Sequence, residues 1–350
     1  MNEIEENLGW ALIENEFHPG YNKITERLMR SGNGCVSQMA NFEERFTGET
    51  DQGNYLTGIS DPELSHDGKA RKGHTGNSHG FLSAADWRGI DVRINSEILD
   101  LNTSNILYFR RILNMQTAIL YRSFAVELPS GKQLKVDTHR FLSIVDPEIG
   151  AIKYTVTPLN FSDKLTLIPF IDFEPRGGNE KKDRKFWDEV AIDVIPGEGY
   201  LSAEVCKALS QVCTGMKINI LRNGIQSNYS ADVENRHKYI ANIISLKVTK
   251  GESVTIEKFG INVLSQNYPK GQLMEIAKDH LNIAFQKGFE QLEKEHTDAN
   301  LKRWDTISPI RSQDKTAQLQ MRFNQFRQFQ KFQEDDGVPI EDELPEWLLQ

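Results

Sequence analysis

The sequence predicts a mainly β protein, in which a large antiparallel β-sandwich is followed by an α-helical linker. Between about Ile90 and Leu264, apolar and polar residues alternate, which is typical of strands that are buried on one face. After Tyr268 the apolar residues recur at the spacing of an amphipathic helix. These patterns divide the chain into a β-sandwich domain at residues 1–268, a helical linker at 269–333 and an acidic tail at 334–350.

The strands are inferred from short alternating runs that are separated by turn residues. In LYRSFAVEL, residues 120–128, apolar side chains share one face, and the alternation resumes after the turn PSGK, which predicts a β-hairpin. AIKYTVTPL at 151–159 alternates in the same way, and residues 243–259 repeat the pattern with a turn at Lys250–Gly251. Many such strands without helices between them are typical of an antiparallel sandwich.

Helical spacing predicts one amphipathic helix or a pair of helices over residues 270–303. Pro309 ends this segment, because proline cannot continue a helix. Ser312 is expected to cap a further helix, with Asp314 in its first turn, where an anion is favoured. The acidic tail is expected to fray, apart from weak docking by three apolar residues, Trp347, Leu348 and Leu349.

The last predicted helix has an apolar stripe at three-residue spacing, formed by Phe323, Phe326, Phe329 and Phe332. Four phenylalanine side chains of about 150–250 Å² each would form a larger exposed patch than most soluble monomers show. We therefore expect the stripe to be covered by the sandwich, by self-association through this helix or by a separate chain.

The composition favours a soluble cytoplasmic protein whose main partner is neither nucleic acid nor a membrane. The 350 residues have a formal net charge of −9, which argues against a polyanionic partner surface. Three cysteines without a CxxC pair fit a reduced compartment better than a disulfide framework. The acidic start lacks a secretory signal, and no run reaches the ~18 apolar residues that a membrane span needs.

The segment RSGNGCVSQMANFEERFTGETDQGNY, residues 30–55, holds two candidate sites. A phosphate loop needs glycines between a strand and a helix, but no GK[ST] follows Gly32-Asn33-Gly34 and no βαβ pattern surrounds it. A tight turn with a positive φ at Gly or Asn is favoured instead. Glu43 and Glu44 are neighbours, whereas glycosidase carboxylates flank one bond, roughly 5 to 9.5 Å apart. A surface pair or a loop-anchoring pair is therefore favoured.

The other candidate side chains also fit structural roles better than chemical ones. One polar loop gathers six residues that are able to bind a metal or a phosphate, His66, Lys69, Arg71, Lys72, His74 and His79. Their spacing matches no tetrahedral zinc template, so a mobile polar loop is favoured. Cys35, whose strongest positive neighbour is Arg30, is expected to be a buried or half-buried thiol, and His139 a structural histidine.

No Ser-His-Asp, HExxH or deaminase pattern occurs in the sequence. We therefore assign no catalytic, cofactor-binding or metal-binding residue, and we expect no cofactor.

Several segments in order resemble one known family. ITERLMRSGNGCVSQMANFEERFTGETDQGNYLTGI at 24–59 resembles the N-terminal signature of the family-65 glycoside phosphorylases, of the maltose phosphorylase type in particular. Residues 109–172 resemble the family's sandwich strands. LKRWDTISPIRSQDKTAQLQMRFNQFRQFQ at 301–330 resembles its linker, with seven matching positions, Trp304, Asp314, Gln318, Arg322, Phe323, Asn324 and Phe326. The resemblance covers about residues 8–332.

This resemblance implies an N-terminal β-sandwich, a helical linker and an (α/α)6 barrel that performs the chemistry. Such enzymes cleave an α-glucosidic disaccharide with inversion to β-glucose 1-phosphate and glucose. A single Glu protonates the leaving oxygen and phosphate replaces water, so no second carboxylate is needed as a base. The barrel, with its general acid and phosphate site, has no counterpart in this sequence. We therefore expect the isolated chain to be inactive.

The signature is also altered in this chain. Ser37 replaces a glycine and Met39 an arginine, while Ser308 and Gln313 replace an aspartate and a glycine of the linker. Because arginine is a five-donor cation and methionine has no charge, we expect any ion pair that this arginine makes in the family to be absent here.

Three functions remain open. The chain is the N-terminal half of a phosphorylase, with a separate catalytic barrel chain as a possible partner. Alternatively, it is a non-catalytic accessory protein that binds an α-glucoside or a partner. Least favoured is an enzyme that uses the histidine-rich loop or the carboxylate pair.

Overall fold

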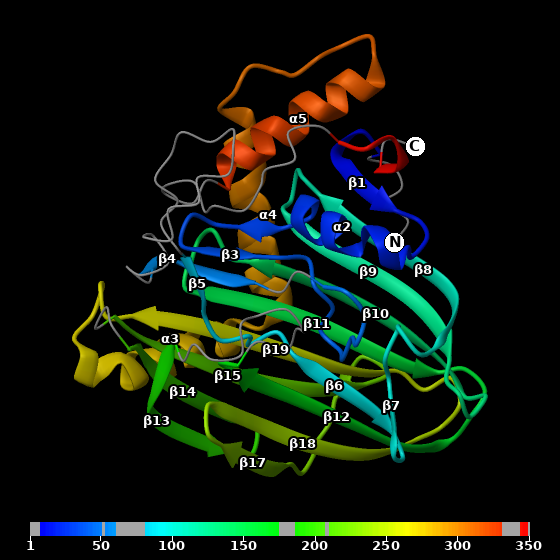
Figure 1. The fold of residues 1–350 in the computed structure, drawn as a ribbon, viewed down its shortest axis with the longest axis vertical. Helices are drawn as coiled ribbons and strands as arrows, with labels where there is room; N and C mark the ends of the chain where they lie inside the picture. The colour runs from blue at the N-terminus through cyan, green and yellow to red at the C-terminus, as the bar shows by residue number, and fades with distance from the viewer. Residues whose placement is uncertain are drawn as a thin grey trace.

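The computed structural model describes residues 8–50, 53–60, 81–174, 186–206, 210–330 and 344–348. Two large antiparallel sheets pack against each other, with a small sheet and several helices beside them (Figure 1). The predicted fold class, an antiparallel sandwich followed by helices, is confirmed. Within the described ranges, no helix is both long enough and apolar enough to cross a membrane.

The larger sheet has ten strands. In spatial order it comprises β1 (Ala11–Glu14), β8 (Asn105–Asn114), β9 (Ile119–Glu127), β10 (Gln133–Leu142), β11 (Ile149–Pro158), β19 (Val254–Leu264), β15 (Gln211–Arg222), β14 (Glu198–Val205) and β13 (Trp187–Ile195), with β16 (Ile225–Gln226) paired to β15.

The second large sheet has five strands and the small sheet has four. The five are β17 (Asp232–Arg236), β18 (Tyr239–Val248), β12 (Asp163–Asp172), β6 (Ile90–Ile94) and β7 (Glu97–Ile98). The four are β2 (Ser31–Gly32), β3 (Val36–Gln38), β4 (Asn54–Ser60) and β5 (Phe81–Ser83). Short helices flank the small sheet in sequence, η1 (Leu8–Trp10), η2 (Pro19–Tyr21) and α2 (Asn22–Leu28).

The main core lies between the two large sheets and follows the predicted period of two. Along the hairpin of β9 and β10, Phe124 pairs with Val136 and Val126 pairs with Leu134. All four side chains are completely buried. The hairpin turn lies where the sequence predicts it, and Gly131 has a φ of +81°, which a residue with a β-carbon rarely adopts.

The predicted turn at Lys250–Gly251 joins strands that belong to different sheets. β18 pairs with β12 and β17, whereas β19 pairs with β11 and β15. The turn therefore carries the chain from one layer of the sandwich to the other. Alternation predicts where such a turn lies. It does not distinguish a turn between two sheets from a hairpin within one sheet, because the strands bury one face in either case.

The first part of the linker is a pair of helices, one of the two forms that the sequence allows. η3 (Lys270–Gln272) and α3 (Leu273–Lys287) are followed by α4 (Phe289–Asp305), and Gly288 lies between the helices with a φ of +79°. Both helices pack on the outer face of the ten-stranded sheet, where Phe259 and Ile261 of β19 contact their apolar residues.

The third linker helix, α5 (Lys315–Phe329), begins at a different cap from the one predicted. Asp314 is the N-cap, and its Oδ1 accepts hydrogen bonds from the backbone N–H groups of Thr316 at 2.9 Å and Ala317 at 3.3 Å. Ser312 instead accepts a hydrogen bond from the Asp314 N–H at 3.2 Å. The prediction of Ser312 as the cap is wrong, because the helix starts later and a carboxylate two residues on reaches its free donors.

The phenylalanine stripe of α5 is covered by the chain itself. Phe323 and Phe326 are each only 2% exposed, in a cluster that includes Leu12 of β1 and Leu113 of β8. The Phe329 ring lies edge-on to Trp304, with the ring centroids 4.8 Å apart. Of the three alternatives for covering the stripe, the sandwich provides the cover for Phe323 and Phe326. Phe332 lies outside the described residues.

Part of the acidic tail docks beside the same cluster. η4 (Glu346–Leu348) places the Trp347 ring in a stack on Tyr21, with the centroids 5.4 Å apart, and buries Leu348. The predicted docking is confirmed for these two residues, while Leu349 lies outside the described ranges.

Replacing Phe326 with alanine is expected to destabilise the docked helix by about 3–5 kcal/mol, because it opens a cavity in a packed cluster. Calorimetry should show a lower Tm, and light scattering should show an unchanged mass. Met321→Ala is the matched control, because Met321 lies on the same helix and is 48% exposed. A change of mass at an unchanged Tm would contradict the packing described above.

The buried His296 of α4 is expected to make stability depend on pH. Burial lowers its pKa to about 4, although the Ala118 carbonyl opposes this shift. In the unfolded chain the pKa of His296 is about 6.5, so the unfolded chain takes up a proton before the folded chain does. The free energy of unfolding therefore falls by about 3 kcal/mol as the pH falls from ~6.5 to ~4.

The test compares urea unfolding of the wild type and His296→Phe over this pH range. Phenylalanine retains a ring on Phe141, which stacks on His296 at 4.7 Å, and it has no proton to gain. We expect a shallower loss of stability in this variant and an unchanged loss in His237→Phe, whose side chain is 64% exposed. Equal slopes in all three proteins would contradict the assignment.

Candidate functional site

The glycine-rich turn between β2 and β3 uses its own backbone donors. Gly34 has a φ of +90°, as the turn interpretation predicts. The Oδ1 atom of Asn33 accepts hydrogen bonds from the N–H groups of Cys35 at 3.0 Å and Val36 at 2.9 Å. Since these amides are already paired, they do not form a phosphate cradle, and the tight turn is confirmed.

Glu43 and Glu44 lie buried against two arginines of the ten-stranded sheet. Arg122 of β9 donates to Glu43 Oε2 at 2.5 Å, to Glu44 Oε1 at 2.5 Å and to Glu44 Oε2 at 2.7 Å. Arg140 of β10 donates to Glu43 Oε1 at 2.5 Å, and the Tyr154 hydroxyl donates to Glu44 Oε2 at 3.1 Å. The two carboxylates therefore anchor their segment, which confirms the loop-anchoring alternative.

The backbone of the same segment is also bound by arginines. Arg88 donates to the carbonyl of Met39 at 2.6 Å, and Arg111 of β8 donates to the carbonyl of Ala40 at 2.9 Å. Met39 itself is 1% exposed, so its side chain lies in the interior. We call the four side chains that hold residues 39–44 the arginine cluster, Arg88, Arg111, Arg122 and Arg140.

The electrostatics of the cluster favour ion pairing over acid–base chemistry. Burial alone would raise the pKa of Glu43, but the charges of Arg140 and Arg122 outweigh it and hold that pKa below its usual range. Burial likewise opposes the charge of Arg122, yet Glu44 and Glu43 raise its pKa. A general acid needs a raised carboxyl pKa. Glu43 is therefore an ionised anchor and not a proton donor.

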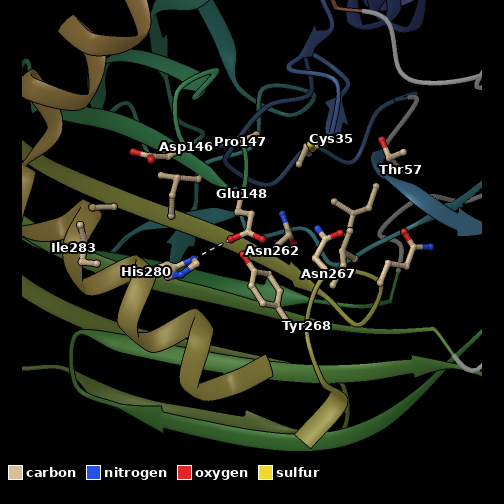
Figure 2. A pocket seen from close by; sticks show the side chains of 16 residues that line it. Cys35, Thr57, Asp146, Pro147, Glu148, Asn262, Asn267, Tyr268, His280 and Ile283 are labelled. Carbon is tan, nitrogen blue, oxygen red and sulfur yellow. Dashed lines mark hydrogen bonds and ion pairs between the residues drawn. The ribbon is translucent and has the colours of Figure 1, made fainter. Parts of the chain in front are cut away.

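An open pocket lies where the glycine-rich turn, the loop before β11 and helix α3 meet (Figure 2). It has a volume of about 650 Å³. Glu148 of this loop contacts His280 of α3, with Glu148 Oε2 lying 3.0 Å from His280 Nδ1. Asn33 fixes this loop by donating to the carbonyl of Pro147 at 2.9 Å. We call this cavity the Glu148–His280 pocket.

Cys35 lines this pocket and is exposed, so the expectation of a buried or half-buried thiol is wrong. The glycine-rich turn places it at the rim, because the Asn33 side chain takes the interior position. Desolvation of the sulfur at the pocket wall and the nearby Glu148 charge raise the thiol pKa. A raised pKa leaves less thiolate at neutral pH, which disfavours Cys35 as a nucleophile.

Of the candidate histidines, His139 lies in the described part of the chain. His139 pairs with Glu293 at 3.0 Å and stacks on Tyr121 at 5.6 Å, so it is a structural histidine. The loop that contains His66, His74 and His79 lies outside the described residues. In the part of the chain that the structure describes, no three His, Cys, Asp or Glu residues are arranged to hold a metal ion.

The arginine cluster and the partners in the pocket were not predicted from the sequence. Glu148, Tyr268 and His280 come from different elements, and no local motif joins them. The charged residues Arg122 and Arg140 on alternating strands were a usable signal, because a charge on an inward position of a strand requires a buried partner.

Comparison with known proteins identifies the family. The N-terminal domain of glycosyl hydrolase family 65 matches residues 12–303, so the chain belongs to this family. It is 25% identical over 335 residues to a maltose phosphorylase from Bacillus subtilis (strain 168), a match that covers 96% of this chain and 43% of the relative. It is 27% identical over 356 residues to an alpha,alpha-trehalose phosphorylase from Thermoanaerobacter brockii, covering 95% of this chain and 44% of the relative.

A solved structure supports the fold. A putative kojibiose phosphorylase from the human microbiome superposes with a TM-score of 0.79 at 20% identity, over 92% of this chain and 41% of the other. The chain therefore spans less than half the length of these relatives. The matched region is their N-terminal domain, as the signature at residues 24–59 predicts.

Replacing Arg122 with methionine is expected to destabilise the sandwich by about 3–5 kcal/mol, because two buried carboxylates lose their shared partner. Urea unfolding at neutral pH measures the loss. Lys294→Met is the control, since its pair with Asp298 lies on the surface of α4 and is expected to leave the midpoint unchanged. A stable Arg122→Met protein would show that the carboxylates are not anchored as described.

Proposed function

We propose that this chain is the non-catalytic N-terminal β-sandwich of a family-65 phosphorylase that acts on an α-glucosidic disaccharide. The family match over residues 12–303 carries this proposal. The pairing of Glu43 and Glu44 with Arg122 supports it, because these two carboxylates are bound by a buried arginine and anchor their segment. The general acid and the phosphate site are then supplied by an (α/α)6 barrel domain.

In the proposed reaction, phosphate attacks the anomeric carbon of an α-glucoside while one acid protonates the leaving oxygen. The configuration inverts, and β-glucose 1-phosphate and glucose leave. Phosphate is already a nucleophile, so the reaction needs one protein acid and no protein base. The sandwich contributes a rigid support, with a β-sandwich at residues 1–268, a linker at 269–333 and a tail at 334–350.

The barrel is the proposed partner of this chain, and the cytoplasm is its proposed compartment. The helices α3, α4 and α5 pack on the sandwich, so they form a fixed base on which a barrel domain is able to dock. Burial of Phe323 and Phe326 disfavours self-association through α5. Cys35, Cys206 and Cys213 form no disulfide in the described part of the chain, which suits a reducing compartment.

A non-catalytic accessory protein that binds an α-glucoside is the second candidate function. The Glu148–His280 pocket favours it, because a cavity of about 650 Å³ with polar and apolar walls lies within the range of small-molecule sites.

The purified chain is expected to release no glucose from maltose, trehalose or kojibiose in the presence of phosphate. A coupled assay for β-glucose 1-phosphate measures this, with heat-denatured protein as the blank. Phosphate-dependent release above the blank would overturn the non-catalytic assignment.

The partner proposal has its own test. The DNA downstream of the codon for Gln350, in the same reading frame or in an adjoining one, is expected to encode a barrel. The barrel protein, mixed with this chain, should copurify with it and show phosphorolysis. An adjoining frame without a barrel would favour the accessory protein.

A further inference from the structure

The Glu148–His280 pocket is built from segments that are far apart in the sequence. The turn at Cys35, the loop at Glu148, the end of β19 and helix α3 each contribute part of the wall (Figure 2). Its volume of about 650 Å³ lies within the ~300–1,000 Å³ that small-molecule sites occupy. The described residues thus form a pocket that is large enough for a small ligand.

The charges around the pocket are already paired. Glu148 lies 3.0 Å from His280 Nδ1, and Asp146 lies 3.0 Å from the Nζ atom of Lys287 on α3. Neither arginine nor lysine occurs among the described residues that line the cavity. A phosphate would therefore find no lysine or arginine in this lining, and the one lining histidine, His280, is already paired with Glu148; an amine would compete with existing partners for each carboxylate.

The lining also contains three neutral side-chain amides, those of Asn262, Gln266 and Asn267. Thr214 donates to Asn262 Oδ1 at 2.9 Å, which leaves the Asn262 Nδ2 group for another acceptor. Gln266 Nε2 donates to the Gly58 carbonyl at 2.6 Å, which leaves Gln266 Oε1 for another donor. Asn267 is exposed at the rim, so it offers both kinds of group.

Apolar surface completes the walls. Val36, Leu56, Ile149 and Leu264 line the cavity together with the ring of Tyr268. A ligand that fits these walls has C–H surfaces for the aliphatic and aromatic side chains. It also has uncharged groups that both donate and accept hydrogen bonds.

We infer that the Glu148–His280 pocket binds a neutral saccharide of one or two rings. Sugar hydroxyls both donate and accept, so they match the free amide groups of Asn262 and Gln266. The C–H faces of a sugar ring suit the Tyr268 ring and the aliphatic wall. The inference rests on the lining of the pocket and holds whether or not the chain supports a phosphorylase barrel.

Cys35 provides the probe for the test. It lines the pocket and is exposed, while Cys213 is buried with its pKa raised to about 11, chiefly by that burial. Cys206 is also exposed, so Cys206→Ser leaves Cys35 as the accessible thiol. The full-length Cys206→Ser protein is alkylated with iodoacetamide at mildly alkaline pH, and the rate at Cys35 is followed by mass spectrometry with and without maltose or glucose.

We expect maltose or glucose to slow alkylation of Cys35 several-fold in a saturable manner. Adding Asn267→Leu to the Cys206→Ser protein should abolish this protection, because leucine retains the side-chain size and removes the amide. Asn235→Leu, at an exposed position of β17, is the matched control and should retain the protection. Circular dichroism checks that each variant is folded.

Three results would overturn the inference. These are equal alkylation rates with and without sugar, protection by inorganic phosphate but not by maltose or glucose, and full protection in the Asn267→Leu variant. The phosphorolysis assay is a separate measurement. An inactive chain without protection therefore fails the pocket inference, together with the accessory function that uses the same pocket, and leaves the phosphorylase proposal standing. An active chain with protection fails only the non-catalytic assignment.

Discussion

The shared ion pair of Arg122 with Glu43 and Glu44 is the interaction on which the N-terminal half of the structure depends. Arg111 and Arg122 are direct cross-strand partners on β8 and β9, and Arg140 lies two residues beyond the partner of Arg122 on β10. Like charges on one face of a sheet repel each other. Burial increases the repulsion, so this face is stable only because the carboxylates lie against it.

This constraint extends to the pocket. The arginine cluster holds residues 39–44, and the short strand β3 joins that segment to the turn at Asn33. Asn33 donates to the Pro147 carbonyl, one residue before Glu148, so the position of the carboxylate follows from the position of the turn. A polar network that satisfies every member in this way fixes one geometry, because any displacement leaves buried donors unpaired. The arginine cluster therefore helps to fix the geometry of the Glu148–His280 pocket.

Local patterns in the sequence predicted the elements of this fold but few of its long-range contacts. The alternation of β9 and β10, the helical period after Tyr268 and the turn at Gly34 depend on neighbouring residues, and all three are present. The partners of Glu43 lie 79 and 97 residues away, so no spacing rule reaches them. The cap of α5 was misplaced by two residues, because serine and aspartate are both good caps and only the backbone geometry decides between them.

The contacts that cover the α5 stripe were likewise not predictable from local sequence patterns. A stripe of phenylalanines predicts that a cover exists, but it does not say which surface provides it. Trp304 provides the link here: its ring lies edge-on to Trp10 at 4.7 Å and to Phe329 at 4.8 Å, and its Nε1 donates to the Met115 carbonyl at 3.0 Å. The end of α4, the start of the chain and α5 thus meet at one side chain. A domain that docks on α5 would take its orientation from the sandwich through this contact.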